Sequence, residues 1–173
     1  MKTVYENPWF KVLQENQYHF IKEQGSDNGA IIIAKLNDLF LFVRVFRQAH
    51  QSYIIELPRG YGEINETSIM AAIREFQEET GYIILSENIE KIGTVKPNSS
   101  ILCSNIPIFL AKICENTEQD MSLMHKETDK ILFLTKKEVY EHILNGKISD
   151  GMSLSALMLY FAKVDSEALN HTI

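Results

Sequence analysis

One stretch constrains the fold more than any other, namely residues 60–82, which read GYGEINETSIMAAIREFQEETGY. Gly81 stands where many helices end in a left-handed residue. In the second half of the stretch, apolar residues recur at the spacing of a single helix face, at positions Ile69, Ala72, Ile73 and Phe76. The stretch therefore predicts an amphipathic helix that packs one face on a core and ends just before Gly81.

Three carboxylates share the flank of this helix: Glu75, Glu78 and Glu79. Their spacing of i, i+3 and i+4 stacks them within about one turn, and each like-charge pair costs an isolated helix about 0.2–0.5 kcal/mol. Acids near the C-terminal end also oppose the helix dipole, and Arg74 offsets only part of this. Two interpretations follow: a solvated acidic face, as in most Glu-rich helices, or a cation site whose hard oxygen ligands suit Mg²⁺ or Mn²⁺.

The whole stretch resembles the Nudix box, whose pattern is G-x5-E-x7-R-E-U-x-E-E-x-G-U, where U is a bulky aliphatic residue. The two U places hold the aromatic residues Phe76 and Tyr82, a mild departure. The resemblance implies a strand–loop–helix unit in a Nudix fold that hydrolyses a nucleoside diphosphate linked to another group. It is specific, because seven fixed positions fall in register over 23 residues: Gly60, Glu66, Arg74, Glu75, Glu78, Glu79 and Gly81.

The resemblance also implies what the box residues do. Glu75, Glu78 and Glu79 would hold Mg²⁺ or Mn²⁺, and the backbone carbonyl of Arg59 would be a further ligand. Such ions neutralise a diphosphate and lower the pKa of a bound water. Arg74 would orient the box carboxylates, whereas Glu66 would support the loop.

The segment before the box, residues 45–60, reads VFRQAHQSYIIELPRG and resembles the lead-in of the ADP-ribose pyrophosphatase-like branch, in which an arginine ends a strand before E-L-P-x-G. The resemblance implies that Arg47 and Glu56 face the substrate, since a guanidinium fork suits a diphosphate. The side chain of Arg59 could touch phosphate or lie in solvent. Pro97, 16 residues after the box glycine, occupies a position associated with ADP-ribose-type substrates, although a proline can simply rigidify a turn.

An acidic group precedes the expected strand at residues 131–134. The branch resembled here places a carboxylate in that position as a general base, for which Glu127 is the first choice and Asp129 the second. A box glutamate such as Glu78 is the alternative base. For Glu127 and Asp129, a solvated loop remains an equally good interpretation.

The rest of the chain predicts an α/β fold, a Nudix-type α/β/α sandwich with a mixed β-sheet, the box helix on one side and the C-terminal helix on the other. Apolar runs at 30–35 and 39–46 predict a hairpin. We expect a Nudix hydrolase domain at 29–164, an N-terminal strand pair within 1–28 that packs on or extends it, and a C-terminal tail at 165–173. Further strands are expected at 82–85, 90–95, 105–113 and 131–134, and helices at 136–144 and from about 150 to 164.

The composition indicates which classes of binding partner the chain is not suited to. A net charge of −6 without a basic stripe argues against nucleic-acid binding, and no apolar run is long enough for a membrane span. The first residues lack a secretory signal, and Cys103 and Cys114 match no zinc or paired pattern. They are expected to be free core thiols of a cytoplasmic protein. The Nudix branch also allows a homodimer through the strand-rich N-terminus.

We therefore expect a metal-dependent hydrolase that cleaves the pyrophosphate bond of a nucleoside diphosphate derivative, with ADP-ribose or a similar nucleotide sugar as the best match. Two alternatives stay open. One is a Nudix hydrolase of dinucleoside polyphosphates or nucleoside triphosphates. The other is a non-catalytic nucleotide sensor on the same fold, which would have no need of the acidic triad.

Overall fold

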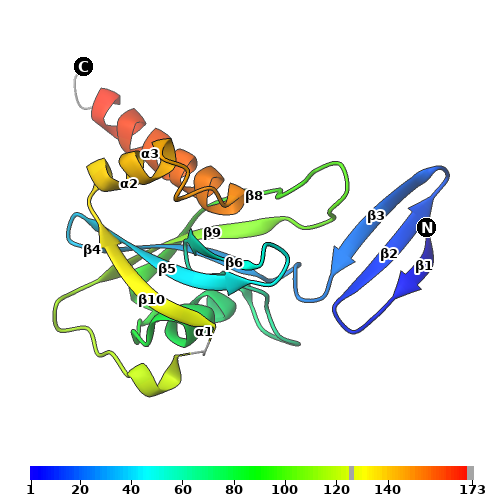
Figure 1. The fold of residues 1–173 in the computed structure, drawn as a ribbon, viewed down its shortest axis with the longest axis horizontal. Coiled ribbons are helices and arrows are strands. Elements are labelled where there is room, and N and C mark those ends of the chain that lie inside the picture. Colours follow the sequence, from blue (N-terminus) through cyan, green and yellow to red (C-terminus); the bar gives the residue numbers. More distant parts are fainter. Residues whose placement is uncertain (125–126, 171–173) are drawn as a thin grey trace.

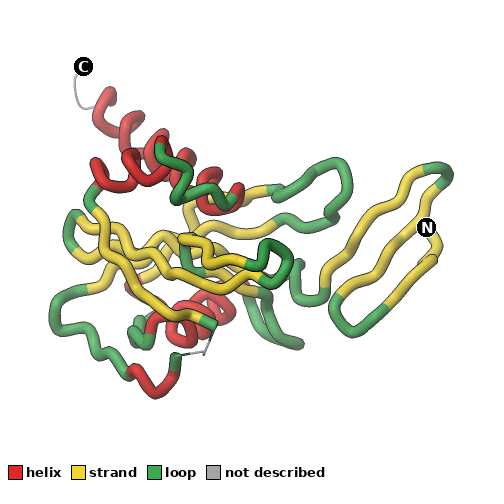
Figure 2. The backbone as a smooth tube through the Cα atoms, viewed as in Figure 1, coloured by secondary structure: helices red, strands yellow, loops and turns green. Residues whose placement is uncertain are grey.

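The computed structural model describes residues 1–124 and 127–170, which form a small N-terminal sheet and a seven-stranded main sheet with helices on both faces (Figures 1 and 2). The small sheet contains β1 (Lys2–Glu6), β2 (Phe10–Glu15) and β3 (Tyr18–Glu23). The main sheet contains β4 (Ala30–Leu36), β5 (Leu39–Arg47), β6 (Ser52–Glu56), β7 (Arg59–Gly60), β8 (Ile89–Val95), β9 (Ile106–Ile113) and β10 (Thr128–Leu134). The helices are α1 (Ser68–Thr80), α2 (Lys136–Leu144) and α3 (Gly151–Asn170), with short 3₁₀ turns η1 (Ser86–Asn88) and η2 (Met121–Leu123).

The main sheet is mixed. Its order is β10-β5-β4-β9-β8, while β6 pairs with β5 and β7 pairs with β4. Strands β4 and β9 run parallel, from Ile31 opposite Ile108 to Leu36 opposite Ile113, and the other pairs are antiparallel. The expected hairpin of β4 and β5 is confirmed, and its two-residue turn places Asn37 at a positive φ of 54°.

Each face of the sheet has its own apolar core, which explains the continuous apolar runs of the central strands. Alternate residues of β4 point to opposite faces: Ile32 packs in the core beneath α1, whereas Ile31 and Ile33 pack in the core beneath α2 and α3. The α/β/α sandwich expected from the sequence is therefore confirmed, with α1 and α3 on opposite sides of the sheet (Figure 1).

Helix α1 forms as its sequence predicts. The hydroxyl of Thr67 accepts a hydrogen bond from Met70 N (3.4 Å) at the first turn. At the other end Gly81 adopts a left-handed φ of 73° and donates its N–H to the Gln77 carbonyl (2.7 Å). Ala72 and Phe76 are fully buried against the sheet, so the opposite flank of the helix is left to the acidic residues.

Some local predictions were wrong. The segment 82–85 is no strand, because after the helix cap its backbone bonds to the loop at residues 118–119 through Ile83 N and a single bridge at Tyr82. Helix α3 continues to Asn170, six residues past its expected end, since no glycine or proline interrupts 165–170. Strand β1 was not foreseen. Cys103 and Cys114 are free but exposed rather than in the core.

The N-terminal sheet projects from the body of the molecule (Figure 1). None of the side chains in β1, β2 or β3 is fully buried. The sheet is joined to the body through Ile21, whose N–H donates to Ile101 O (2.7 Å) and whose carbonyl accepts from Cys103 N (2.9 Å). These strands thus lack a core of their own.

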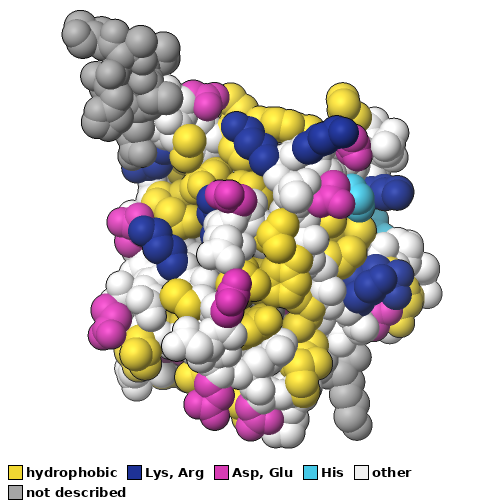
Figure 3. Space-filling model, turned by 90° about the vertical axis from the view of Figure 1, so that its left-hand side faces the viewer, with side chains coloured by type: hydrophobic (Ala, Val, Ile, Leu, Met, Phe, Trp, Pro, Cys, Tyr) yellow, Lys and Arg dark blue, Asp and Glu magenta, His cyan; other side chains and the backbone are white. Residues whose placement is uncertain are grey.

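The face turned away from the N-terminal sheet carries acidic and basic side chains close together, with hydrophobic ones exposed between them (Figure 3). This face therefore presents no broad field of a single sign. Among the residues that the structure describes, no helix combines the length and the hydropathy needed to cross a membrane.

Candidate active site

The acidic flank of α1 faces the short strand β7. Glu79 is the most enclosed of its carboxylates, with 8% of the residue exposed, and its Oε2 accepts a hydrogen bond from Arg59 N (3.0 Å). Burial raises the pKa of Glu79 to about 8, and the nearby charges of Glu56 and Glu75 add to the rise. A carboxyl with such a pKa is mostly protonated at neutral pH when no cation is beside it.

Strand β7 turns the peptide groups of Arg59 toward this carboxylate. Ile32 N donates to Pro58 O (2.8 Å), and the adjacent antiparallel pair is Ile31 opposite Arg59. Hydrogen-bonded and non-hydrogen-bonded pairs alternate along such a ladder, so the N–H and the carbonyl of Arg59 both face away from β4. The N–H meets Glu79, and the carbonyl, the expected metal ligand, lies on the same side.

Arg74 connects most of the remaining box carboxylates. Its Nε and Nη2 form a fork on Glu66 (3.0 and 2.9 Å), and its Nη1 donates to Glu75 (2.7 Å) and Glu78 (2.9 Å). Nη2 also reaches the carbonyl of Tyr61 (2.9 Å), so all five N–H donors of the guanidinium are used. These bonds raise the pKa of Arg74 and lower that of Glu66. Arg74 thus fixes the helix flank to the preceding loop.

The loop between β7 and α1 is held from two sides. Glu66 accepts a hydrogen bond from Glu63 N (2.8 Å) in addition to the fork from Arg74. Asn28 donates to the carbonyls of Glu63 and Glu66 (2.8 Å each) from the turn before β4. Sequence reasoning missed Asn28, which shows only as a turn residue in the GSDNG segment.

Gly60 brings the box helix close to β7. A Cβ at this position would lie 2.0 Å from the carboxyl carbon of Glu75. Only a residue without a side chain therefore lets the Glu75 carboxylate lie directly over the strand. This close approach explains physically why the first position of the box is a glycine.

Across β7 lies a second charged group centred on Glu56, which is 1% exposed. One of its carboxylate oxygens pairs with Arg47 Nη2, and the other accepts from Arg59 Nη2 (3.1 Å). Arg59 also lies 3.8 Å from Asp150, the residue whose carboxylate caps α3 by accepting from Ser153 N (2.8 Å). Glu56 therefore faces the two guanidinium groups.

The arrangement of box and lead-in residues agrees with a comparison of the sequence against known families. Residues 26–151 match the model of the NUDIX domain. The chain belongs to the Nudix family. Nudix domains are typically pyrophosphohydrolases that bind small nucleotide substrates and use a divalent metal ion.

Three proteins of known name are similar to this chain in sequence, at identities of 24–30%. A methanol dehydrogenase activator from Bacillus methanolicus is 26% identical over 142 residues, covering 82% of this chain and 74% of the relative. An ADP-ribose pyrophosphatase from Bacillus subtilis (strain 168) is 24% identical over 131 residues, covering 75% and 70%. An ADP-sugar pyrophosphatase from Mus musculus is 30% identical over 87 residues, covering 47% and 40%.

The fold of this Nudix protein is also that of a solved structure, an ADP compounds hydrolase. The two superpose with a TM-score of 0.73 over 96% of this chain and 92% of the other, at 16% identity. That likeness shows the shared fold alone.

The donor set of the Nudix box fits a divalent cation. Three carboxylates and the Arg59 carbonyl are hard oxygen donors of the kind that Mg²⁺ and Mn²⁺ prefer, and in the part of the chain that the structure describes no cationic side chain is bonded to the buried Glu79. Within residues 1–124 and 127–170, no three His, Cys, Asp or Glu side chains already converge on one point. Glu75 and Glu78 each bond to Arg74 through one oxygen (2.7 and 2.9 Å), so an ion would share these two carboxylates with the guanidinium.

The structure does not bring the remaining predicted residues to the same place. Glu127 is exposed at the start of β10, and its carbonyl accepts from Phe46 N (3.3 Å), next to Arg47. Asp129 is bound to the guanidinium of Arg44, with Nε to Oδ1 at 2.9 Å, which lowers the pKa of Asp129. Pro97 lies in the loop after β8. The roles of these residues stay predictions.

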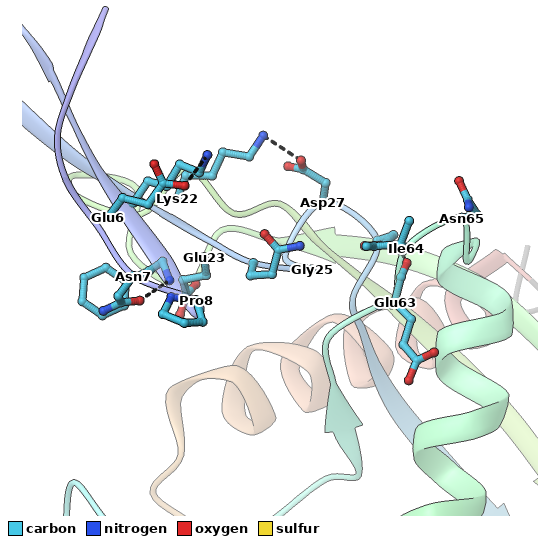
Figure 4. A pocket seen from close by; sticks show the side chains of 15 residues that line it. Glu6, Asn7, Pro8, Lys22, Glu23, Gly25, Asp27, Glu63, Ile64 and Asn65 are labelled. Atoms are coloured by element: carbon cyan, nitrogen blue, oxygen red, sulfur yellow. Dashed lines mark hydrogen bonds and ion pairs between the residues drawn. The ribbon is translucent and has the colours of Figure 1, made fainter.

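A pocket of about 570 Å³ lies between the N-terminal sheet and the loop that connects β7 to α1 (Figure 4). Its two lysines are already paired, Lys11 with Glu6 (2.8 Å) and Lys22 with Asp27 (2.8 Å). Their positive charges are therefore compensated by the protein itself, which makes this pocket a poor place for an anionic substrate.

Proposed function

We propose that this Nudix protein is a metal-dependent hydrolase that cleaves the pyrophosphate bond of a nucleoside diphosphate derivative, with ADP-ribose or a similar nucleotide sugar as substrate. One observation carries the proposal. At β7 the peptide N–H of Arg59 meets the box carboxylate Glu79, while the side chain of Arg59 shares Glu56 with the guanidinium of Arg47. A diphosphate needs both a cation site and a fixed anion site. The relatives named for ADP-ribose and ADP-sugars support the choice of substrate.

The box residues would hold the ion. Glu75, Glu78 and Glu79, with the carbonyl of Arg59, supply only oxygen ligands. When bound, Mg²⁺ or Mn²⁺ neutralises the diphosphate and lowers the pKa of a bound water. Because Glu79 is mostly protonated in the empty site, it would give up its proton on binding the ion.

The other residues would position the substrate and accept a proton. Arg47, held by Glu56, would fix the diphosphate, and Arg74 would keep the box carboxylates aligned. Glu127 would take the proton of the attacking water, with Glu78 as the alternative base. Asp129 is the weaker choice, because Arg44 already engages its carboxylate. Pro97 would shape a loop near the substrate.

The N-terminal sheet would serve a homodimer in the cytoplasm. Its three strands have no fully buried side chain, although they carry large apolar residues that stay exposed, such as Val4, Tyr5 and Tyr18. A small sheet without a covered face gains stability when another surface covers it. A second copy of the chain would provide that surface, and sedimentation equilibrium would measure it.

A substrate panel tests the enzyme proposal. With Mg²⁺, the wild type should convert ADP-ribose to AMP and ribose 5-phosphate faster than it cleaves dinucleoside polyphosphates or nucleoside triphosphates, and EDTA should stop the reaction. Glu75→Gln and Glu79→Gln should each lose at least about a hundredfold in kcat with the circular dichroism spectrum retained. Glu90→Gln, an exposed position on β8, is the matched control. Wild-type turnover by Glu79→Gln would refute the ligand assignment.

A further inference from the structure

A small pocket opens beside Gly60, between β4, β7 and the start of α3. It holds about 120 Å³, roughly the share of four water molecules, and its polar lining comes from Arg47, Arg59 and Tyr61. We call it the arginine pocket. It adjoins the box carboxylates through Gly60, which lines it and also lies directly beneath Glu75.

Two acidic side chains, Glu56 and Asp150, lie beside the guanidinium groups of the arginine pocket. Two guanidinium groups share the single buried carboxylate of Glu56. The nearby carboxylate of Asp150 is 3.8 Å from Arg59, and its other oxygen already accepts from the backbone and the hydroxyl of Ser153 (2.8 and 2.7 Å). Of these two carboxylates, Glu56 is the one hydrogen-bonded to both guanidinium groups, whereas Asp150 lies beyond hydrogen-bond distance of Arg59.

The hydrogen bonds of the two arginines are incomplete. Each guanidinium has five N–H donors, and among the residues that the structure describes, the buried Nε of Arg47 and that of Arg59 find no acceptor. A buried donor without a partner is unfavourable. A phosphoryl group, with its several acceptor oxygens, is the kind of ligand that two such forks bind well.

We propose that the guanidinium of Arg59 is a second phosphate-binding group, which holds one phosphoryl group of the substrate together with Arg47 in the arginine pocket. This assignment rests on the proposed function and adds a specificity residue to it. The backbone of Arg59 faces the box carboxylates, while its side chain reaches Glu56 at the pocket. A diphosphate bound across Gly60 would thus contact both sites.

Tyr61 closes the pocket on the side of the N-terminal sheet. Its hydroxyl donates to Glu23 Oε1 (2.5 Å), and Ser104 donates to the other oxygen of the same carboxylate (2.8 Å). The ring is therefore held in place. In a pocket this small, one phosphoryl group fits beside the ring and the rest of the substrate stays outside.

Binding of a non-hydrolysable diphosphate tests the proposal without relying on turnover. Methylenediphosphonate is titrated calorimetrically into the full chain with Mg²⁺ present. Arg59→Ala should bind it about 10- to 100-fold more weakly, as expected for the loss of a charged hydrogen-bonding group. Arg59→Lys, which keeps the charge without the fork, should fall between. Lys91→Ala, an exposed position on β8, removes the same charge and should bind like the wild type.

A double-variant cycle separates this role from a structural one. If Arg59 only neutralises Glu56, then adding Arg59→Ala to Glu56→Gln will cost no further affinity, and the proposal is overturned. We expect a further loss of tenfold or more. Should Arg59→Ala fail to fold, Arg59→Gln takes its place, and an affinity equal to that of the wild type would overturn the proposal.

The two proposals fail in different ways. A wild type that releases no AMP from ADP-ribose, yet loses diphosphonate affinity in Arg59→Ala, refutes the substrate and keeps the anion site. A wild type that hydrolyses ADP-ribose with an unchanged KM in Arg59→Ala refutes the role of Arg59 and keeps the enzyme.

Discussion

Glu79 makes the stability of the metal-free protein depend on pH. Its carboxyl is buried beside β7 and accepts a hydrogen bond from the N–H of Arg59 (3.0 Å), while Glu56 and Glu75 add negative charge nearby. Its pKa therefore rises from 4.5 to about 8 on folding. The folded state binds the proton more tightly than the unfolded state does.

The direction and size of the effect follow from linkage. A raised carboxyl pKa gives stability that is fully present below pH 4.5 and is lost as the pH rises through about 8. Between these values the free energy of unfolding should fall by about 1.4 kcal/mol per pH unit from this one group, up to about 5 kcal/mol in all. Glu66 and Asp129 have lowered pKa values, so their contribution is lost only at acid pH.

Urea unfolding in EDTA between pH 5 and pH 8.5 measures this dependence. Glu79→Gln keeps the shape of the side chain but cannot titrate, so its stability should gain on that of the wild type as the pH rises. Addition of Mg²⁺ at pH 8 should stabilise the wild type and have little effect on Glu79→Gln. Parallel stability curves for the two proteins from pH 5 to pH 8.5 would refute the reasoning.

Three other substitutions test the geometry around the box helix. Gly60→Ala should lower kcat at least about tenfold with little change in Tm, because its Cβ would meet the Glu75 carboxyl at 2.0 Å and displace it; an unchanged kcat would contradict this. Thr67→Ala should lower the free energy of unfolding by about 1 kcal/mol in urea, whereas Thr67→Ser should not, since serine keeps the capping oxygen. Gly81→Ala should cost about 1–2 kcal/mol, because φ is 73° and the new Cβ would lie 2.8 Å from the Asp120 carbonyl; a neutral result in the same assay would argue against the cap.

The features of the fold that could be predicted from the sequence depend on residues close together in the chain. The helix that ends at Gly81 follows from its apolar spacing and from the cap chemistry of that glycine, whereas its start at Thr67 was not predicted. The hairpin across Asn37 follows from two apolar strands and a polar turn. Helix α2 has the predicted bounds, and the fold class follows from a motif whose positions are fixed by one strand–loop–helix unit.

The features that could not be predicted from the sequence depend on contacts between distant segments. The strand expected at 82–85 is replaced by pairing with a loop more than 30 residues later. The side chain of Arg59, for which solvent exposure and phosphate contact were both open, is held by Glu56 and lies near Asp150 on another element. No local spacing encodes such a neighbour. The roles of Glu127 and Pro97 stay predictions for the same reason.

The charges of the site divide into two groups that behave differently without ligand. Glu66, Glu75 and Glu78 accept four of the five hydrogen bonds that Arg74 donates. Glu79 accepts a hydrogen bond from a peptide N–H and holds its proton at neutral pH, whereas Arg47 and Arg59 share the carboxylate of Glu56. At the cation site three carboxylates thus face one guanidinium, and at the anion site the buried Nε donors of Arg47 and Arg59 lack an acceptor among the residues that the structure describes. A metal-bound diphosphate supplies a cation to the first site and acceptor oxygens to the second, so metal and diphosphate should each strengthen the binding of the other.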